Sequence, residues 1–173
     1  EMLIDDLNNT IDGWIKALKH YSFIQLCTKP SPESWSPGQM YLHLVSDTNF
    51  YIRQIKTCIS SNDNAMEEAS PFAKKMFLNN DFPDAIIEGD PSNAQIPQPV
   101  SKEHLMGLML NLKNEINAVA ILISTTACKG KTKHPGFNYF SAEEWLQFAD
   151  MHFRHHLRQK KRIDDFFKID KYA

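Results

Sequence analysis

The sequence predicts an all-α fold in which four long helices form one bundle. Apolar residues recur at spacings of three and four in four separate segments, which is the period of an amphipathic helix. Two of these segments begin with a capping sequence, Ser-x-x-Gln or Ser-x-x-Glu. Alternation of apolar and polar residues, which marks a strand, is scarce, so we expect no sheet. A chain of 173 residues favours a single domain, residues 1–173.

The first two helices have clear starts or ends. The first covers residues 2–27 and ends before Pro30 and Pro32. The second begins at Ser36, whose hydroxyl suits an N-cap, with Gln39 completing a capping box, and it fades over residues 60–63. The apolar stripe of the first helix contains Leu3, Leu7, Ile11, Trp14, Leu18 and Tyr21, and that of the second contains Met40, Leu44, Phe50, Tyr51 and Ile55.

Residues 62–100 form a long irregular connection with room for one short helix at residues 71–78. A connection of this length joins helices that are not antiparallel neighbours, which argues against a simple up-down-up-down order. The third helix follows Ser101 and continues to about residue 124. After a turn-rich loop, the fourth begins at Ser141 and continues to Phe167. The prolines that interrupt the connection are Pro71, Pro83, Pro91, Pro97 and Pro99.

Composition excludes several classes of function. The net charge is −2 and the pI is about 6.4, so we expect no nucleic-acid partner, which would require a basic face. The sequence lacks an uninterrupted apolar run of 18 residues, so we expect no membrane span. Cys27, Cys58 and Cys128 lie far apart, without a CxxC motif, which favours a reducing, cytoplasmic location.

The most informative residues are histidines. His152 and His156 are four residues apart, so on a helix both imidazoles leave one face and can bind one metal ion. His43 lies on the second predicted helix, and a bundle can bring two such helices face to face. Three histidines would form an open site for zinc or nickel, with a position left for water or substrate. Sequence spacing also allows His152 with His155, but we favour His152 with His156.

Other polar residues near these histidines have less defined roles. Asp47, Asp150 and Gln159 could orient a ring or a water molecule, or lie on the helix surface. His43 by itself could be a core histidine, and His134 could contact a pocket mouth or serve only in a turn. We interpret His20 and His104 as structural or exposed.

Two stretches of the chain resemble a known family. The first is a tryptophan-led helix start that runs from Trp35 to Leu44 and contains His43. The second combines a His-Pro-x-Phe loop at residues 134–137, a Glu-Trp helix start at 141–145 and a His-x-x-His-His-x-x-Gln run at 152–159. In their order and separation these stretches resemble the DinB-like superfamily of metalloenzymes.

This resemblance implies a four-helix bundle of up-down-down-up order, with the long crossover between the second and third helices. It also implies a metal held by His43, His152 and His156. Some members of the superfamily are transferases or isomerases that use a low-molecular-weight thiol, others are classed as metal-dependent hydrolases, and many have no known activity. Asn138 stands where relatives often have glycine, which bears on the shape of the loop.

Our leading hypothesis is a metal-dependent hydrolase that acts on a small-molecule substrate. A thiol-dependent S-transferase or isomerase is the first alternative. A non-catalytic, metal-stabilised stress-response bundle is the second, and a metal-free bundle, such as a homodimer, is the third. The sequence identifies no general acid or base.

Overall fold

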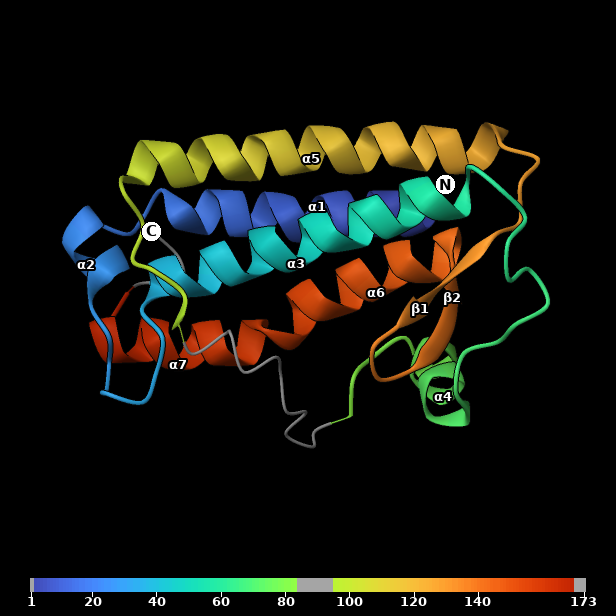
Figure 1. Ribbon diagram of the computed structural model, residues 1–173. Helices are drawn as coiled ribbons and strands as arrows, with labels where there is room; N and C mark the ends of the chain where they lie inside the picture. Colours follow the sequence, from blue (N-terminus) through green and yellow to red (C-terminus); the bar gives the residue numbers. More distant parts are fainter. Residues whose placement is uncertain (1, 84–94, 170–173) are drawn as a thin grey trace.

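The computed structural model describes residues 2–83 and 95–169, and within them the chain is mainly helical. Its long segments are α1 (Met2–Leu18), α3 (Pro37–Cys58), α5 (Lys102–Thr125) and α6 (Ala142–His155), the last continued by α7 (Leu157–Phe167). In Figure 1, α3 and α5 run in one direction while α1 and α6 run in the other. This confirms the all-α class and the up-down-down-up order, with the long crossover between α3 and α5.

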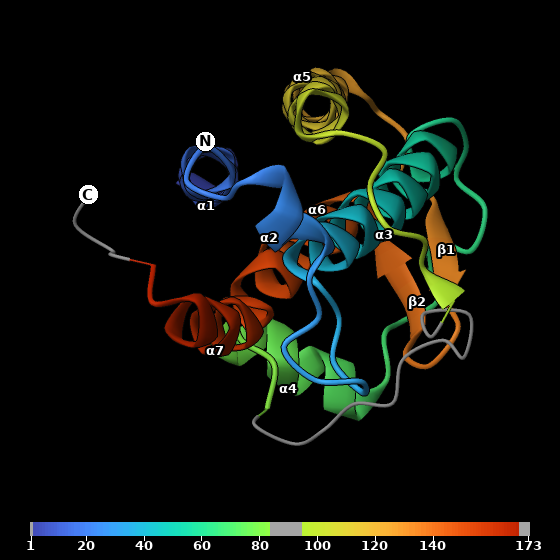
Figure 2. The same ribbon diagram turned by 90° about the vertical axis from the view of Figure 1, so that its left-hand side faces the viewer.

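The bundle core is aromatic at its centre. Both α3 and α1 pack against α5 and α6, and Figure 2 shows these helices from one end. Trp14, Tyr41 and Phe153 are fully buried, and the ring of Trp14 lies 5.3 Å from Tyr41 and 6.2 Å from Phe153 in edge-on contacts. The Tyr41 hydroxyl donates a hydrogen bond to the Trp14 carbonyl (2.7 Å). These contacts fix α3 and α6, the helices that carry the histidines, relative to one another.

The first predicted helix is broken in the structure. Helix α1 ends at Leu18, and α2 (Phe23–Cys27) follows after a turn. Ser22 and Gln25 form a capping box in which each side chain bonds the other residue's backbone N–H. The prediction of one helix over residues 2–27 was therefore wrong across the turn, although the Ser-x-x-Gln sequence was a readable start signal.

The crossover contains α4 (Pro71–Asn79), close to the predicted short helix, and then returns to the start of α3. Pro91 lies outside the described residues. The Gln39 side-chain amide donates to the Ile96 carbonyl, and the Ser36 hydroxyl donates to Gln98 Oε1, both at 2.7 Å. A Cβ on Gly38 would lie 2.4 Å from Pro99 Cγ, so only glycine allows this close approach. The crossover is thereby fixed close to His43.

A two-stranded hairpin contradicts the expectation of no sheet. Strands β1 (Lys131–His134) and β2 (Asn138–Ser141) are antiparallel, and His134 pairs with Asn138 across a three-residue loop. Asn138 has a φ of 62°, the left-handed conformation that such loops require and that asparagine and glycine both adopt. Each strand has four residues. Strand β1 contains two lysines and no apolar residue, and β2 has Tyr139 and Phe140 side by side, so neither shows an alternating apolar pattern.

The fourth predicted helix is interrupted at His156, where α6 ends and α7 begins. His156 has φ −75° and ψ −7°, and its backbone N–H still reaches the His152 carbonyl at 3.3 Å. Helix α7 is held against the turn between α1 and α2 by Asp164, a buried residue that accepts hydrogen bonds from the Tyr21 hydroxyl and from Lys160 Nζ. The interruption was not predicted, because neither proline nor glycine marks it.

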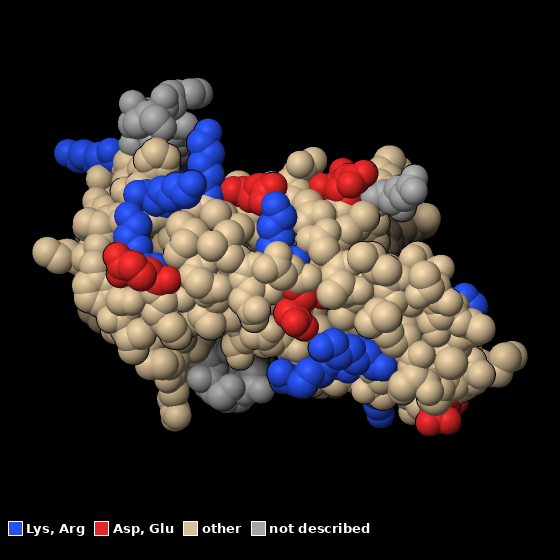
Figure 3. All heavy atoms as spheres, turned by 90° about the horizontal axis from the view of Figure 1, so that it is seen from above, with Lys and Arg blue, Asp and Glu red and all other residues tan. Residues whose placement is uncertain are grey.

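The outer face of the bundle is lightly charged. Seen from above α5, Lys and Arg side chains are scattered among Asp and Glu on a mainly uncharged surface (Figure 3). Leu110, Ile121 and Leu122 of α5 are exposed on that helix. By length and composition alone α5 could cross a membrane, although polar residues interrupt its apolar sequence. One such helix is weak evidence for a membrane segment, because helices of soluble bundles pass the same test.

Candidate metal centre

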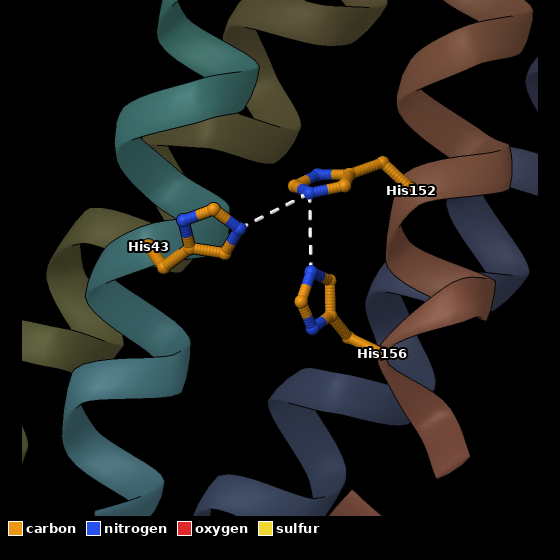
Figure 4. A group of neighbouring side chains, drawn as sticks. All are labelled: His43, His152 and His156. Atoms are coloured by element: carbon orange, nitrogen blue, oxygen red, sulfur yellow. Dashed lines mark hydrogen bonds between the residues drawn. The ribbon is translucent and has the colours of Figure 1, made fainter. Parts of the chain in front are cut away.

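Three histidines from two parts of the chain meet between α3 and α6. His43 comes from α3, His152 from α6 and His156 from the junction of α6 with α7. The Nε2 atom of His152 lies 3.1 Å from that of His43 and 3.1 Å from that of His156. Figure 4 shows the three rings pointing toward one another. The structure thus brings together the three residues predicted as metal ligands.

Aromatic side chains surround the three rings. The Trp35 ring lies 4.7 Å from His43 and 6.3 Å from His156, and the Tyr51 ring contacts His152 edge-on at 5.8 Å. Trp35 immediately precedes the Ser36 cap that starts α3. The sequence that begins this helix therefore also places the Trp35 ring beside the histidines.

Gln159 sets the orientation of His156. Its Oε1 lies 2.9 Å from His156 Nδ1, and an amide oxygen can only accept, so Nδ1 carries the hydrogen. A neutral imidazole has one N–H, which leaves a lone pair on Nε2 directed at the other histidines. Among the described residues, nothing bonds the buried Nδ1 of His152, so packing holds that ring.

The two aspartates predicted to orient a ring are placed differently. Asp150 accepts hydrogen bonds from Arg154 Nε (3.0 Å) and the Thr10 hydroxyl (2.9 Å), and so joins α6 to α1. Asp47 Oδ2 lies 3.5 Å from His43 Nε2 and 3.6 Å from His152 Nε2. Asp47 therefore faces the nitrogens that converge, whereas an orienting partner would contact the opposite side of a ring.

The electrostatics of the site favour neutral imidazoles. Burial lowers the pKa of His152 well below its usual value, and the nearby His156 and His43 rings lower it further. Burial also lowers the pKa of His156 to about 4, against a smaller opposing effect from Gln159. Near pH 7 both rings are uncharged and keep lone pairs available. Converging lone pairs repel unless a cation lies between them, so this donor set fits a divalent metal ion.

The other four histidines do not join the three converging rings. The ring of His155 contacts Phe82 at 5.2 Å, so the spacing alternative with His152 and His155 is not the arrangement observed. His134, the last residue of β1, lies among aromatic rings, and its Nδ1 accepts a hydrogen bond from the Gly136 backbone N–H (3.0 Å). Burial lowers the pKa of His134 to about 4. His20 and His104 are exposed.

A cavity of about 110 Å³ lies beneath the hairpin, away from these rings. Cys58, Cys128 and Ser141 are among its lining residues, and the three converging histidines are not. It is smaller than most ligand pockets, which measure about 300–1,000 Å³. Burial raises the pKa of the Cys58 thiol, which leaves that thiol protonated near pH 7 and a poor nucleophile.

The fold and the histidines together define a class: a helical bundle with three convergent imidazoles that can hold one divalent metal ion. The chain belongs to the DinB superfamily, whose sequence model matches residues 7–159. Among solved structures, it is similar to YfiT from Bacillus subtilis, with 17% identity and a TM-score of 0.63 over 98% of this chain and 87% of that one. YfiT is described as a probable metal-dependent hydrolase with an unusual four-helix bundle topology. Among curated proteins, nothing matches.

Proposed function

We propose that the protein is a metal-dependent hydrolase that acts on a small molecule and binds its metal through His43, His152 and His156. The observation that carries this proposal is the convergence of the three Nε2 atoms, with His152 at 3.1 Å from each of the other two. The description of YfiT as a probable metal-dependent hydrolase supports the same class of reaction.

A bound zinc or nickel ion would lower the pKa of a coordinated water to near 7 and so supply a nucleophile. The protein residues have separate tasks around it. His43, His152 and His156 present lone pairs, and Gln159 holds the tautomer of His156. Trp35 covers the rings of His43 and His156 on one side. Asp47 is about a third exposed (35%), so substrate can reach the nitrogens from its side.

The first test is metal content, measured by mass spectrometry on protein without a histidine tag. Wild type should carry about one equivalent of metal per chain, and His43→Ala and His156→Ala should carry none. Because purification can strip a metal, samples incubated with zinc or nickel are measured in parallel. Absence of metal in wild type under all conditions would contradict the proposal.

The second test separates a hydrolase from the alternatives. Metal-loaded protein is assayed on a panel of small esters and amides, with His156→Ala as the inactive control. Turnover that requires the metal supports a hydrolase. A shift of the cobalt(II) spectrum on adding a low-molecular-weight thiol, without hydrolysis, would instead favour a thiol-dependent transferase. A metal that only raises the unfolding temperature would favour a structural role.

A further inference from the structure

The placement of Asp47 carries an inference that rests on the proposed metal site and extends it. Asp47 lies one helical turn after His43 on α3, so both side chains leave the same face of the helix. Its Oδ2 atom lies 3.5 Å from His43 Nε2 and 3.6 Å from His152 Nε2. The carboxylate thus points into the space on which the imidazole lone pairs converge.

The separations of Asp47 from His43 and His152, and of His152 from the other two imidazoles, are close to those of ligands that share one ion. Ligand atoms at 2.0–2.1 Å from a tetrahedral zinc lie about 3.3 Å from one another. The Nε2 atoms are 3.1 Å apart in two pairs, and the two distances to Asp47 exceed the ideal edge by only a few tenths of an ångström. Carboxylate oxygen is an ordinary zinc ligand at that bond length.

We propose that Asp47 is a fourth protein ligand, bound directly to the metal in the resting protein. The centre is then three imidazoles and one carboxylate, rather than an open three-histidine site. The Asp47 side chain is 35% exposed, against 5% for His43 and 10% for His152, and His156 is also only partly buried. The carboxylate is therefore more open to replacement by water or substrate than His43 or His152, and a fifth ligand can enter beside it.

The experiment compares the full chain with Asp47→Ala and Asp47→Asn, each loaded with cobalt(II) and, separately, with zinc. The visible absorption of cobalt reports which groups are bound to the ion. Asp12→Ala is the matched control, because it removes the same charge from an exposed ion pair with Lys113 on the distant α1–α5 surface. Circular dichroism establishes that each variant is folded, and Asp47→Asn keeps the shape of the side chain if Asp47→Ala does not fold.

We expect both Asp47 variants to shift the position and intensity of the cobalt bands, and zinc affinity to fall by at least about 10–100-fold. Asp12→Ala should match wild type in both measurements. Unchanged cobalt bands in the Asp47 variants, with metal still bound, would overturn the direct bond and leave the three-histidine site intact. Wild type that binds neither cobalt nor zinc would overturn both the inference and the proposed function.

Discussion

Buried or partly buried histidines occur in two regions of this molecule, and the regions differ in what the rings face. Between α3 and α6, the Nε2 atoms of His43, His152 and His156 point at one another. In the hairpin, His134 at the end of β1 is surrounded by the rings of Phe137, Phe140, Trp145 and Phe148, with centroids 4.8–5.6 Å away. In both regions burial lowers a histidine pKa to about 4.

A depressed histidine pKa is therefore not by itself the sign of a ligand. His134 satisfies its Nδ1 with the Gly136 N–H and otherwise fills space among aromatic rings. His156 satisfies its Nδ1 with Gln159, but its Nε2 meets a second imidazole nitrogen instead of a carbon surface. The direction of the lone pairs, and not burial, distinguishes a metal centre from a packed histidine.

The largest effect should follow from removing a converging ring. His152→Ala leaves two imidazoles, and we expect zinc affinity to fall by more than about 100-fold, beyond the loss caused by removing an outer partner. His155→Ala removes an adjacent histidine that contacts Phe82, and should bind zinc as wild type does. Chelator competition measures both constants. Equal losses in the two variants would show that the histidine cluster acts without a defined geometry.

A second test concerns the acid sensitivity of the hairpin histidine. The pKa of His134 is about 4 in the folded protein and near 6.5 when unfolded, so between these values the unfolded chain binds more protons. Stability must therefore fall as pH drops from about 6.5 to about 4, by about 3 kcal/mol from this group. His134→Phe keeps an aromatic ring among Phe137, Phe140, Trp145 and Phe148 but cannot titrate.

In zinc-free protein, urea unfolding at several pH values should show a shallower loss of stability below pH 6.5 for His134→Phe than for wild type. His152 and His156 titrate in the same direction, because burial lowers the pKa of each, and so part of the acid loss should remain. Zinc affinity of His134→Phe should equal that of wild type. A lower zinc affinity in His134→Phe would show that the two histidine regions are not independent.

A smaller effect should follow from loosening one ring without removing it. Gln159→Leu leaves His156 in place but removes the oxygen that its Nδ1–H contacts at 2.9 Å. We expect zinc affinity to fall by about 10–100-fold. Gln159→Glu retains an acceptor and should bind zinc at least as well as wild type. If Gln159→Leu binds zinc normally, packing against Trp35 suffices to orient the ring.

Much of this arrangement follows from local sequence rules. The periodic apolar stripes and the caps at Ser36 and Ser141 set two of the main helices, and the i,i+4 spacing placed His152 and His156 on one face. That His43 would meet them could be proposed from the helix pattern and from the family resemblance. Whether the three bind metal remains a prediction.

Other features depend on tertiary contacts that no local pattern encodes. The break at His156 carries no proline or glycine signal, yet it separates α6 from α7 beside the site. The hairpin strands are short and rich in polar residues. They pair because Phe140 is buried among the aromatic rings around His134, and because the Thr132 hydroxyl accepts a hydrogen bond from the Trp145 indole N–H at 2.8 Å. The side of the rings that Asp47 faces depends on how α3 and α6 pack.

The smallest effect is expected from substitutions in the turn that holds His134 among its aromatic neighbours. Asn138 occupies the left-handed region at φ 62°, where glycine fits without strain, so Asn138→Gly should change the free energy of unfolding by no more than about 0.5 kcal/mol. Asn138→Val places a β-branched residue in that conformation and should cost about 1–2 kcal/mol. Urea unfolding measures both. Because the turn contacts the aromatic rings around His134 and not the converging imidazoles, both variants should bind zinc as wild type does. A change in zinc affinity would show that the two histidine regions are coupled.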